Sequence, residues 1–294
     1  MKGRSGFLTL CLFGGLIFLY GPILTMIVYS FNVSKLATVW GGFSTKWYGE
    51  LLDNTQVIDA ALLSLRIAAV SATVATAFGT LAGITLARFG RFRGCTLFSG
   101  MITAPLVMPD VITGLSLLLL FVAMEQAIGW PDGRGSLTII IAHITFSMAY
   151  VAVIIQSRLA AMDNSLEEAA LDLGSRPLQV MVDITLPLLA PGMVAGWLLA
   201  FTLSLDDLVI ATFTTGPGAN TLPMVVFSKV KLGVKPDINA LATIVILTVG
   251  LVVAAASIIG GRVQRQRLAD TQRAAAEPAS AGPRTARLVR RRRE

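Results

Sequence analysis

The stretch Glu168-Ala169-Ala170, followed by Gly174 and, after nine further residues, by Ile184-Thr185-Leu186-Pro187, determines how this chain is interpreted. It is polar and rich in helix-forming residues. It nevertheless lies between two apolar segments, at 136–158 and 188–214. Each of these is long enough to cross a bilayer, which takes about 20 predominantly apolar residues. A polar helical loop between two membrane spans indicates a docking element for a soluble partner.

The loop, at about 163–187, carries the signals of two short helices set at an angle. Ser165 is expected to cap the first helix, with Glu168 reaching back to the backbone N–H of the cap as in a capping box. Gly174 should end that helix in a left-handed turn, because it has no Cβ. Pro177 should then start the second helix. Capping could be the whole role of Glu168.

Composition identifies the chain as a membrane protein. Its 294 residues are 54% hydrophobic and 14% charged, and the mean hydropathy is +0.73, which departs from soluble domains in the apolar direction. The sequence predicts an all-α integral membrane protein with six transmembrane helices, at roughly 7–31, 57–87, 97–127, 136–158, 188–214 and 238–260.

The positions of lysine and arginine predict the orientation, since cytoplasmic flanks carry the excess. With both termini inside, the inner segments hold most of the basic residues: Lys2, Arg4, Arg88, Arg91, Arg93, Arg158, Arg176 and ten arginines after Gly260. The outer loops hold six: Lys35, Lys46, Arg134, Lys229, Lys231 and Lys235. This orientation places the docking loop in the cytoplasm, where ATP is available.

The chain divides into a transmembrane domain at 1–260 and a tail at 261–294 that ends in Arg290-Arg291-Arg292-Arg293-Glu294. The tail lacks apolar runs and is expected to be disordered and cytoplasmic. Its charge suits adhesion to an anionic membrane leaflet. Nucleic-acid binding is the alternative, but no folded module accompanies the arginines.

Three acidic residues lie well inside predicted spans, away from the span ends. Asp110 is near the middle of the third, directly after Pro109, where a carboxylate costs about 2.5–3.5 kcal/mol on insertion scales. Broken helix at membrane depth is tolerated only inside protein or beside a wet cavity, so Asp110 is expected to face a water-filled path.

Asp206 and Asp207 fall in the fifth predicted span and point in different directions, because successive helical residues differ by about 100°. Asp207 shares a stripe with the small residues Gly196, Ala200, Ser204 and Ala211. Small residues at this spacing favour close helix packing. Asp207 is therefore expected in a helix seam, bonded to a neighbour, with Asp206 on the flank. A purely structural role for the pair remains open.

The histidine and the two cysteines do not indicate a metal or redox site. His143 is the single histidine, so no histidine metal cluster can form, and a satisfied role within its own helix is expected. Cys11 and Cys95 fall on the reducing side with no spacing typical of a metal or redox pair.

The docking loop, the run 102–114 (Ile-Thr-Ala-Pro-Leu-Val-Met-Pro-Asp-Val-Ile-Thr-Gly) and the run 204–210 (Ser-Leu-Asp-Asp-Leu-Val-Ile) together resemble the permease subunits of polyamine importers, most of all those for putrescine. The resemblance covers about 7–260 and implies the type I ABC importer permease fold with a cytoplasmic coupling helix. It assigns ATPase coupling to Glu168, Ala169, Ala170, Gly174, Ile184, Leu186 and Pro187, and the substrate path to Asp110, Asp206 and Asp207.

The resemblance also implies partners and a location. These are a homologous second permease in a heterodimer, two ATPase subunits and a periplasmic polyamine-binding protein, in a bacterial inner membrane. This chain would hold no cofactor, and ATP with magnesium would bind the partner ATPase. The sequence itself lacks GxxxxGK[ST], so it has no phosphate-cradling loop and is not expected to be an enzyme. The arginine-rich tail departs from the family pattern.

Two other functions are compatible with parts of the sequence. A proton- or ion-coupled secondary carrier of organic cations would use the buried acids as a relay but would leave the docking loop without a role. A membrane scaffold without transport activity is the other alternative. The choice among putrescine, spermidine and other cations lies beyond the sequence.

Overall fold

The computed structural model describes residues 6–35, 39–90, 92–233 and 236–251. These residues are helical apart from their loops, and an isolated bridge between Asn32 and Phe43 is the only β pairing among them. The described residues form two compact units, one within 50–233 and one of those up to 49 together with 236–251. The predicted tail at 261–294 lies outside the described residues.

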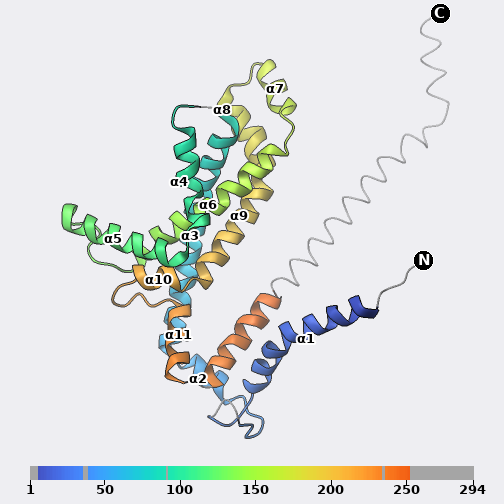
Figure 1. Cartoon of the computed structure of the whole chain (residues 1–294), viewed down its shortest axis with the longest axis vertical. Coiled ribbons are helices and arrows are strands. Elements are labelled where there is room, and N and C mark those ends of the chain that lie inside the picture. Colours follow the sequence, from blue (N-terminus) through green and yellow to red (C-terminus); the bar gives the residue numbers. More distant parts are fainter. Residues whose placement is uncertain (1–5, 36–38, 91, 234–235, 252–294) are drawn as a thin grey trace, which may run out of the picture. The chain divides into compact units, whose positions relative to one another are not determined.

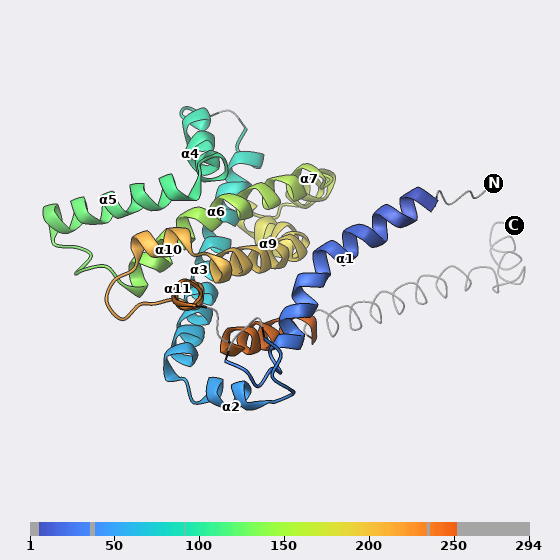
Figure 2. The same ribbon diagram turned by 60° about the horizontal axis from the view of Figure 1, so that its bottom comes forward.

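The larger unit contains most of the helices (Figure 1): α3 (Thr55–Arg88), α4 (Cys95–Val107), α5 (Asp110–Ile128), α6 (Ser136–Ala160), α7 (Ser165–Asp172), α8 (Pro177–Val180), the π-helix η1 (Met181–Thr185), α9 (Leu186–Asp206), α10 (Val209–Thr214) and α11 (Leu222–Leu232). α3, α6 and α9 pack together as the central bundle of this unit. α7 and α8 lie at one end of that bundle, whereas α10 and α11 lie toward the other. Figure 2 shows the same separation after rotation.

Small residues bring α3 and α6 into close contact. A Cβ added at Gly79 would lie 2.6 Å from Val151 Cβ, and one at Gly83 would lie 2.9 Å from the carbonyl oxygen of Ala152. Such small-residue seams are the usual way in which membrane helices approach closely. Val151 is fully buried in the main apolar cluster of this unit. The seam fixes the bundle from which the functional loops extend.

The smaller unit contains α1 (Gly6–Tyr29) and the helix Pro236–Leu251, and α2 (Lys46–Leu52) lies at its boundary in the sequence. α1 is apolar throughout and has no buried residue, as expected for a helix that faces lipid or another subunit. Trp47 is buried instead, and its indole N–H donates to the carbonyl of Asn32 at 2.6 Å. This bond fixes the loop that follows α1.

Five helical stretches are long and apolar enough to cross a membrane: Gly6–Tyr29, Thr55–Arg88, Asp110–Ile128, Ser136–Ala160 and Pro177–Asp206. Cys95–Val107 and Pro236–Leu251 are shorter apolar helices. The all-α, multi-span prediction is therefore confirmed, and the six predicted spans correspond roughly to these elements. The third predicted span is divided between α4 and α5, because Pro109 interrupts it. The sixth begins at Pro236, and its predicted end lies outside the described residues.

Candidate coupling loop and translocation path

The predicted capping of the loop's first helix is wrong in detail. The cap residue of α7 is Asn164, so Ser165 is the first helical residue. The Ser165 N–H donates instead to Asp163 Oδ1 at 2.9 Å. This bond lowers the pKa of the Asp163 carboxyl below its usual value. The Glu168 side chain is exposed on the surface of α7, and it makes no hydrogen bond or ion pair within the described chain.

The end of α7 confirms the prediction for Gly174. Its φ of +87° is left-handed. The Gly174 N–H donates to Leu171 O at 2.9 Å, and the Ser175 N–H donates to Ala170 O at 3.1 Å. These two bonds form the Schellman motif, which satisfies carbonyls that a helix end otherwise leaves unpaired. The angle between α7 and the chain that follows is therefore set by hydrogen bonds.

A polar cluster joins α7 to both neighbouring elements. Arg88, in the last turn of α3, donates to Asn164 Oδ1 and forms an ion pair with Glu167 Oε1 at 3.1 Å. The same Glu167 oxygen accepts the Thr185 hydroxyl, from η1, at 2.9 Å. We call Arg88, Asn164, Glu167 and Thr185 the loop clamp. Sequence reasoning selected Glu168 and counted Arg88 only as an orienting charge. No spacing pattern connects the clamp residues, which come from distant parts of the chain.

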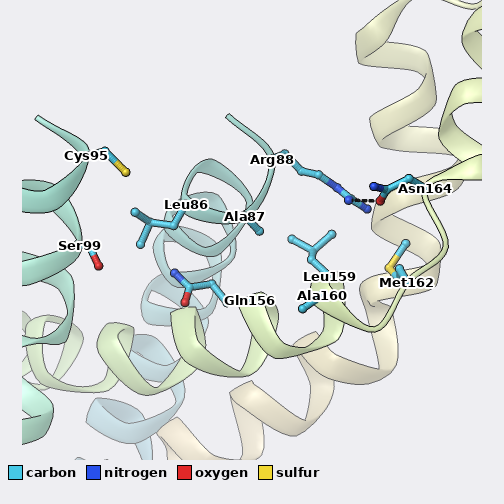
Figure 3. A pocket seen from close by; sticks show the side chains of 10 residues that line it. All are labelled: Leu86, Ala87, Arg88, Cys95, Ser99, Gln156, Leu159, Ala160, Met162 and Asn164. Atoms are coloured by element: carbon cyan, nitrogen blue, oxygen red, sulfur yellow. Dashed lines mark hydrogen bonds between the residues drawn. The ribbon is translucent and has the colours of Figure 1, made fainter. Parts of the chain in front are cut away.

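A cavity of about 540 Å³ adjoins the clamp (Figure 3). It lies between the ends of α3 and α6 and the start of α4, and the side chains of Ser99, Gln156 and Asn164 contribute to its polar lining. Arg88 Nε is buried and has no hydrogen-bond partner among the described residues. The clamp thus borders a cavity on one side, and its charged groups are only partly exposed.

The second predicted helix is not separate. α8, η1 and α9 run on as one helical stretch, Pro177–Asp206. Within it, the Leu186 N–H bonds to Met181 O, five residues back rather than four. Pro187 has no N–H to donate, and a π turn just before a proline shifts the bonding register around that gap. The motif residues Ile184, Leu186 and Pro187 therefore mark a π turn where the coupling loop enters its span.

The loop exposes apolar side chains although it is polar overall. Ala169 is exposed and Ala170 is half-buried on α7. The larger exposed side chains around the loop are Leu166, Leu171, Leu173, Leu178 and Val182, with Leu173 at 88%. Exposed apolar groups gathered in one place mark a surface for another protein. These exposed side chains make the loop a candidate docking surface.

Asp110 lies at a break between helices. α4 ends at Val107, Met108 is extended, and Asp110 begins α5. Its side chain is exposed. The N-terminus of a helix carries partial positive charge, which stabilises a carboxylate in the first turn. The sequence therefore correctly indicated a break in the helix at this acid.

Asp206 and Asp207 also lie at a break, so the prediction of one span through 188–214 is wrong. α9 ends at Asp206, Asp207 is extended, and α10 begins at Val209. The Asp207 carboxylate accepts the N–H groups of Ile210 at 3.2 Å and Ala211 at 2.7 Å. It stabilises the start of α10 in the manner of a cap. Asp206 is exposed, and its side chain forms no hydrogen bond to another residue within the described chain.

His143 bonds between helices, which corrects the expectation of a role within its own helix. Its Nε2 lies 3.1 Å from Asp207 Oδ2, and its Nδ1 lies 2.6 Å from Ser204 Oγ. Ser204 in turn contacts the Ser71 hydroxyl of α3 at 3.0 Å. The expectation that Asp207 bonds a neighbouring helix is confirmed. Among the described residues no group of three or more potential metal ligands comes together.

Comparison with known proteins identifies the class. The profile of the family "binding-protein-dependent transport system inner membrane component" matches residues 78–268. The chain belongs to this family. It is 60% identical to the putrescine transport system permease protein PotI of Escherichia coli strain K12 over 271 residues, covering 92% of this chain and 96% of that protein. It is 42% identical to the spermidine/putrescine transport system permease protein PotC of the same strain over 254 residues, covering 86% and 92%.

Solved structures agree on the fold. The permease superposes on a bacterial ABC transporter that imports the acidic polysaccharide alginate, with a TM-score of 0.68 and 17% identity over 87% of this chain and 98% of that one. It also resembles the MetNI methionine ABC transporter, with a TM-score of 0.53 and 18% identity over 71% and 95%. The permease is thus a multi-pass inner-membrane transport subunit with the ABC importer permease fold, and not an enzyme.

The loop clamp of the permease gives a charge-reversal test. Arg88→Glu is expected to lower uptake at least fivefold, because Glu167 then faces a like charge and α7 loses its contact with α3. Arg88→Glu combined with Glu167→Arg restores opposite charges and should recover at least half of the uptake. Uptake is measured in cells at matched membrane levels. A double variant no better than Arg88→Glu alone would contradict the clamp.

Proposed function

We propose that this permease forms half of the translocation path of an ATP-driven importer of polyamines, and that putrescine is its main substrate. The 60% identity to PotI across nearly the whole chain carries the proposal. The lower identity to PotC favours putrescine over spermidine. The exposed acids Asp110 and Asp206, each at a helix break, give a dication favourable sites along the path.

Charge supports a cation as the substrate class. A carboxylate in a low-dielectric cavity offsets part of the desolvation cost of an ammonium group. Transport also requires sites that release their cargo, which suits single carboxylates rather than a closed cage. The same acids would repel an anion, so the likeness to an importer of an acidic polysaccharide concerns the fold alone.

We further propose the assembly that the resemblance implies: a heterodimer with a homologous permease, two ATPase subunits and a periplasmic polyamine-binding protein. ATP and magnesium would bind the ATPase subunits, and this chain would hold no cofactor. Both termini would lie in the cytoplasm, together with the coupling loop. The surplus of basic residues on that side supports this orientation.

Coupling would run through α7. Its exposed face, with Glu168 and Ala169, would dock on the ATPase together with Ala170 and the turn at Gly174. The Schellman turn and the loop clamp make α7 a rigid lever on the ends of α3 and of the span that starts at Pro177. Closure of the ATPases on ATP would then move this end of the bundle and open the path outward.

A proton-coupled carrier is the rival function, since acids within membrane spans can also relay protons. The complete complex in proteoliposomes separates the two. Labelled putrescine should enter when ATP is supplied on the ATPase side and a protonophore has collapsed the proton gradient. Uptake driven by a pH gradient without ATP would overturn the proposal, as would ATP-driven uptake of spermidine or amino acids but not of putrescine.

A further inference from the structure

The two neighbouring acids at the end of α9 differ in side-chain exposure and in their hydrogen-bond partners. The Asp207 side chain is about 10% exposed and accepts bonds from two backbone N–H groups and from His143. The Asp206 side chain is exposed, and it has no hydrogen bond to any other residue of the described chain. A carboxylate that already accepts three donors has little capacity left for an ammonium group. The Asp206 carboxylate has no bond to another residue that would compete with an ammonium group.

His143, on α6, holds the Asp207 carboxylate and does not bond Asp206. Its side chain is about 2% exposed. An ionised carboxylate only accepts hydrogen bonds, so with Asp207 ionised the donor in this pair is the Nε2–H of His143. Nδ1 meets the Ser204 hydroxyl at 2.6 Å, and Ser204 meets Ser71 of α3. α6, α9 and α3 thus hold the imidazole ring in one orientation, and the ring in turn holds the Asp207 carboxylate toward α10.

We propose that His143 is a positioning residue for transport. By binding Asp207 it fixes the break between α9 and α10 and withholds that carboxylate from the path, so that Asp206 alone meets the cation at this level. The inference rests on the proposed cationic substrate. It also accounts for a histidine placed deep in an otherwise apolar span, where an unpaired polar group would be costly.

The arrangement of the break supports this role. α10 is short, and its first free N–H groups are satisfied by Asp207. At its far end, the Thr138 hydroxyl of α6 donates to Thr214 O at 2.6 Å. α6 therefore holds α10 at both ends, through His143 and Thr138. Loss of the His143 bond frees one end of α10, so that the break no longer holds Asp206 in its place.

Cysteine labelling tests the exposure directly, in the complete complex with Cys11 and Cys95 replaced by serine. Cysteine is introduced by Asp206→Cys or Asp207→Cys, and the probe is 2-aminoethyl methanethiosulfonate, a small cation. We expect the cysteine at 206 to react at least tenfold faster, and its rate to fall at least twofold when putrescine, binding protein and ATP are supplied together. Equal rates, or faster reaction at 207, would overturn the inference.

Variants of His143 test the positioning. The amide nitrogen of glutamine extends to about the place of Nε2, whereas that of asparagine stops near Nδ1. His143→Gln should keep uptake within about twofold of normal, while His143→Asn should lower it at least fivefold at equal complex recovery. In the Asp206→Cys background, His143→Asn should also slow labelling. Equal uptake by both variants would contradict a positioning role.

Ser147→Ala is the matched control. Ser147 lies one turn along the same face of α6, is equally buried, and its hydroxyl has no partner among the described residues. Its uptake should stay normal, and a loss as large as that of His143→Asn would assign the effect to packing of α6. If the unmodified complex fails to import putrescine, the proposed substrate is wrong. The difference in labelling between 206 and 207 is measured without putrescine and stands or falls separately.

Discussion

Uptake should fall at least tenfold when Gly174 is replaced by valine, although the protein should still insert in the membrane. Gly174 has a φ of +87°, and its Schellman bonds end α7. A Cβ built at this position would meet nothing within 4 Å, so no clash is involved. The cost is backbone strain alone, about 1–2 kcal/mol for an ordinary L residue and more for a β-branched one.

Strain of this size is enough to change coupling. Each 1.4 kcal/mol is about a tenfold change in an equilibrium. A loop that relaxes out of the left-handed turn swings α7 away from the position at which an ATPase would bind it. The measurements are putrescine uptake and the amount of ATPase that co-purifies with the permease, at equal levels of permease in the membrane.

Gly174→Asn and Gly174→Ala make the control series. Asparagine adopts left-handed backbone more readily than other side chains, so Gly174→Asn should keep most of the uptake. Gly174→Ala should be intermediate. If uptake instead declines with side-chain size, so that Gly174→Asn is worse than Gly174→Ala, the partner surface and not the turn controls the loop.

The sequence predicts the loop well at positions where the backbone conformation of one residue decides the structure. Gly174 is an example, because a missing Cβ is visible in the sequence and has one common use after a helix. Ser165 was wrongly predicted as the cap, since Asn164 and Asp163 are equally good capping types and only the geometry chooses among them. Element boundaries are therefore uncertain by a residue even where the element itself is clear.

Breaks inside apolar segments were harder to predict. Hydropathy shows that 97–127 and 188–214 are apolar, but it does not show that each is two helices. Pro109 gave a signal for the first break. The second break, at Asp207, has no proline or glycine beside it, and the Asp207 side chain bonds His143, a residue 64 positions away. A bond between distant residues leaves no trace in periodicity, so the loop clamp at Glu167 was missed for the same reason.

Asp110→Asn is expected to lower putrescine uptake strongly without loss of assembly. The change keeps the size of the side chain and removes its charge. A dication passing this site would lose a favourable interaction worth about 1–3 kcal/mol, which corresponds to between about fivefold and more than a hundredfold in rate. Asp110 is exposed at the first turn of α5 and bonds no other side chain in the described chain, so folding does not depend on it.

The control for Asp110 lies on the same helix. Glu125 is an exposed carboxylate in the last turn of α5, far from the break, and Glu125→Gln should transport normally. Asp110→Glu keeps the charge and should retain more uptake than Asp110→Asn. Uptake is compared over a range of low putrescine concentrations, alongside the amount of complex recovered. Unchanged uptake by Asp110→Asn would mean that this carboxylate does not line the cation path. The helix break at Pro109 would then remain, but the charge of Asp110 would have no role in transport. Selection for polyamines would therefore rest on Asp206, on the second permease or on the binding protein.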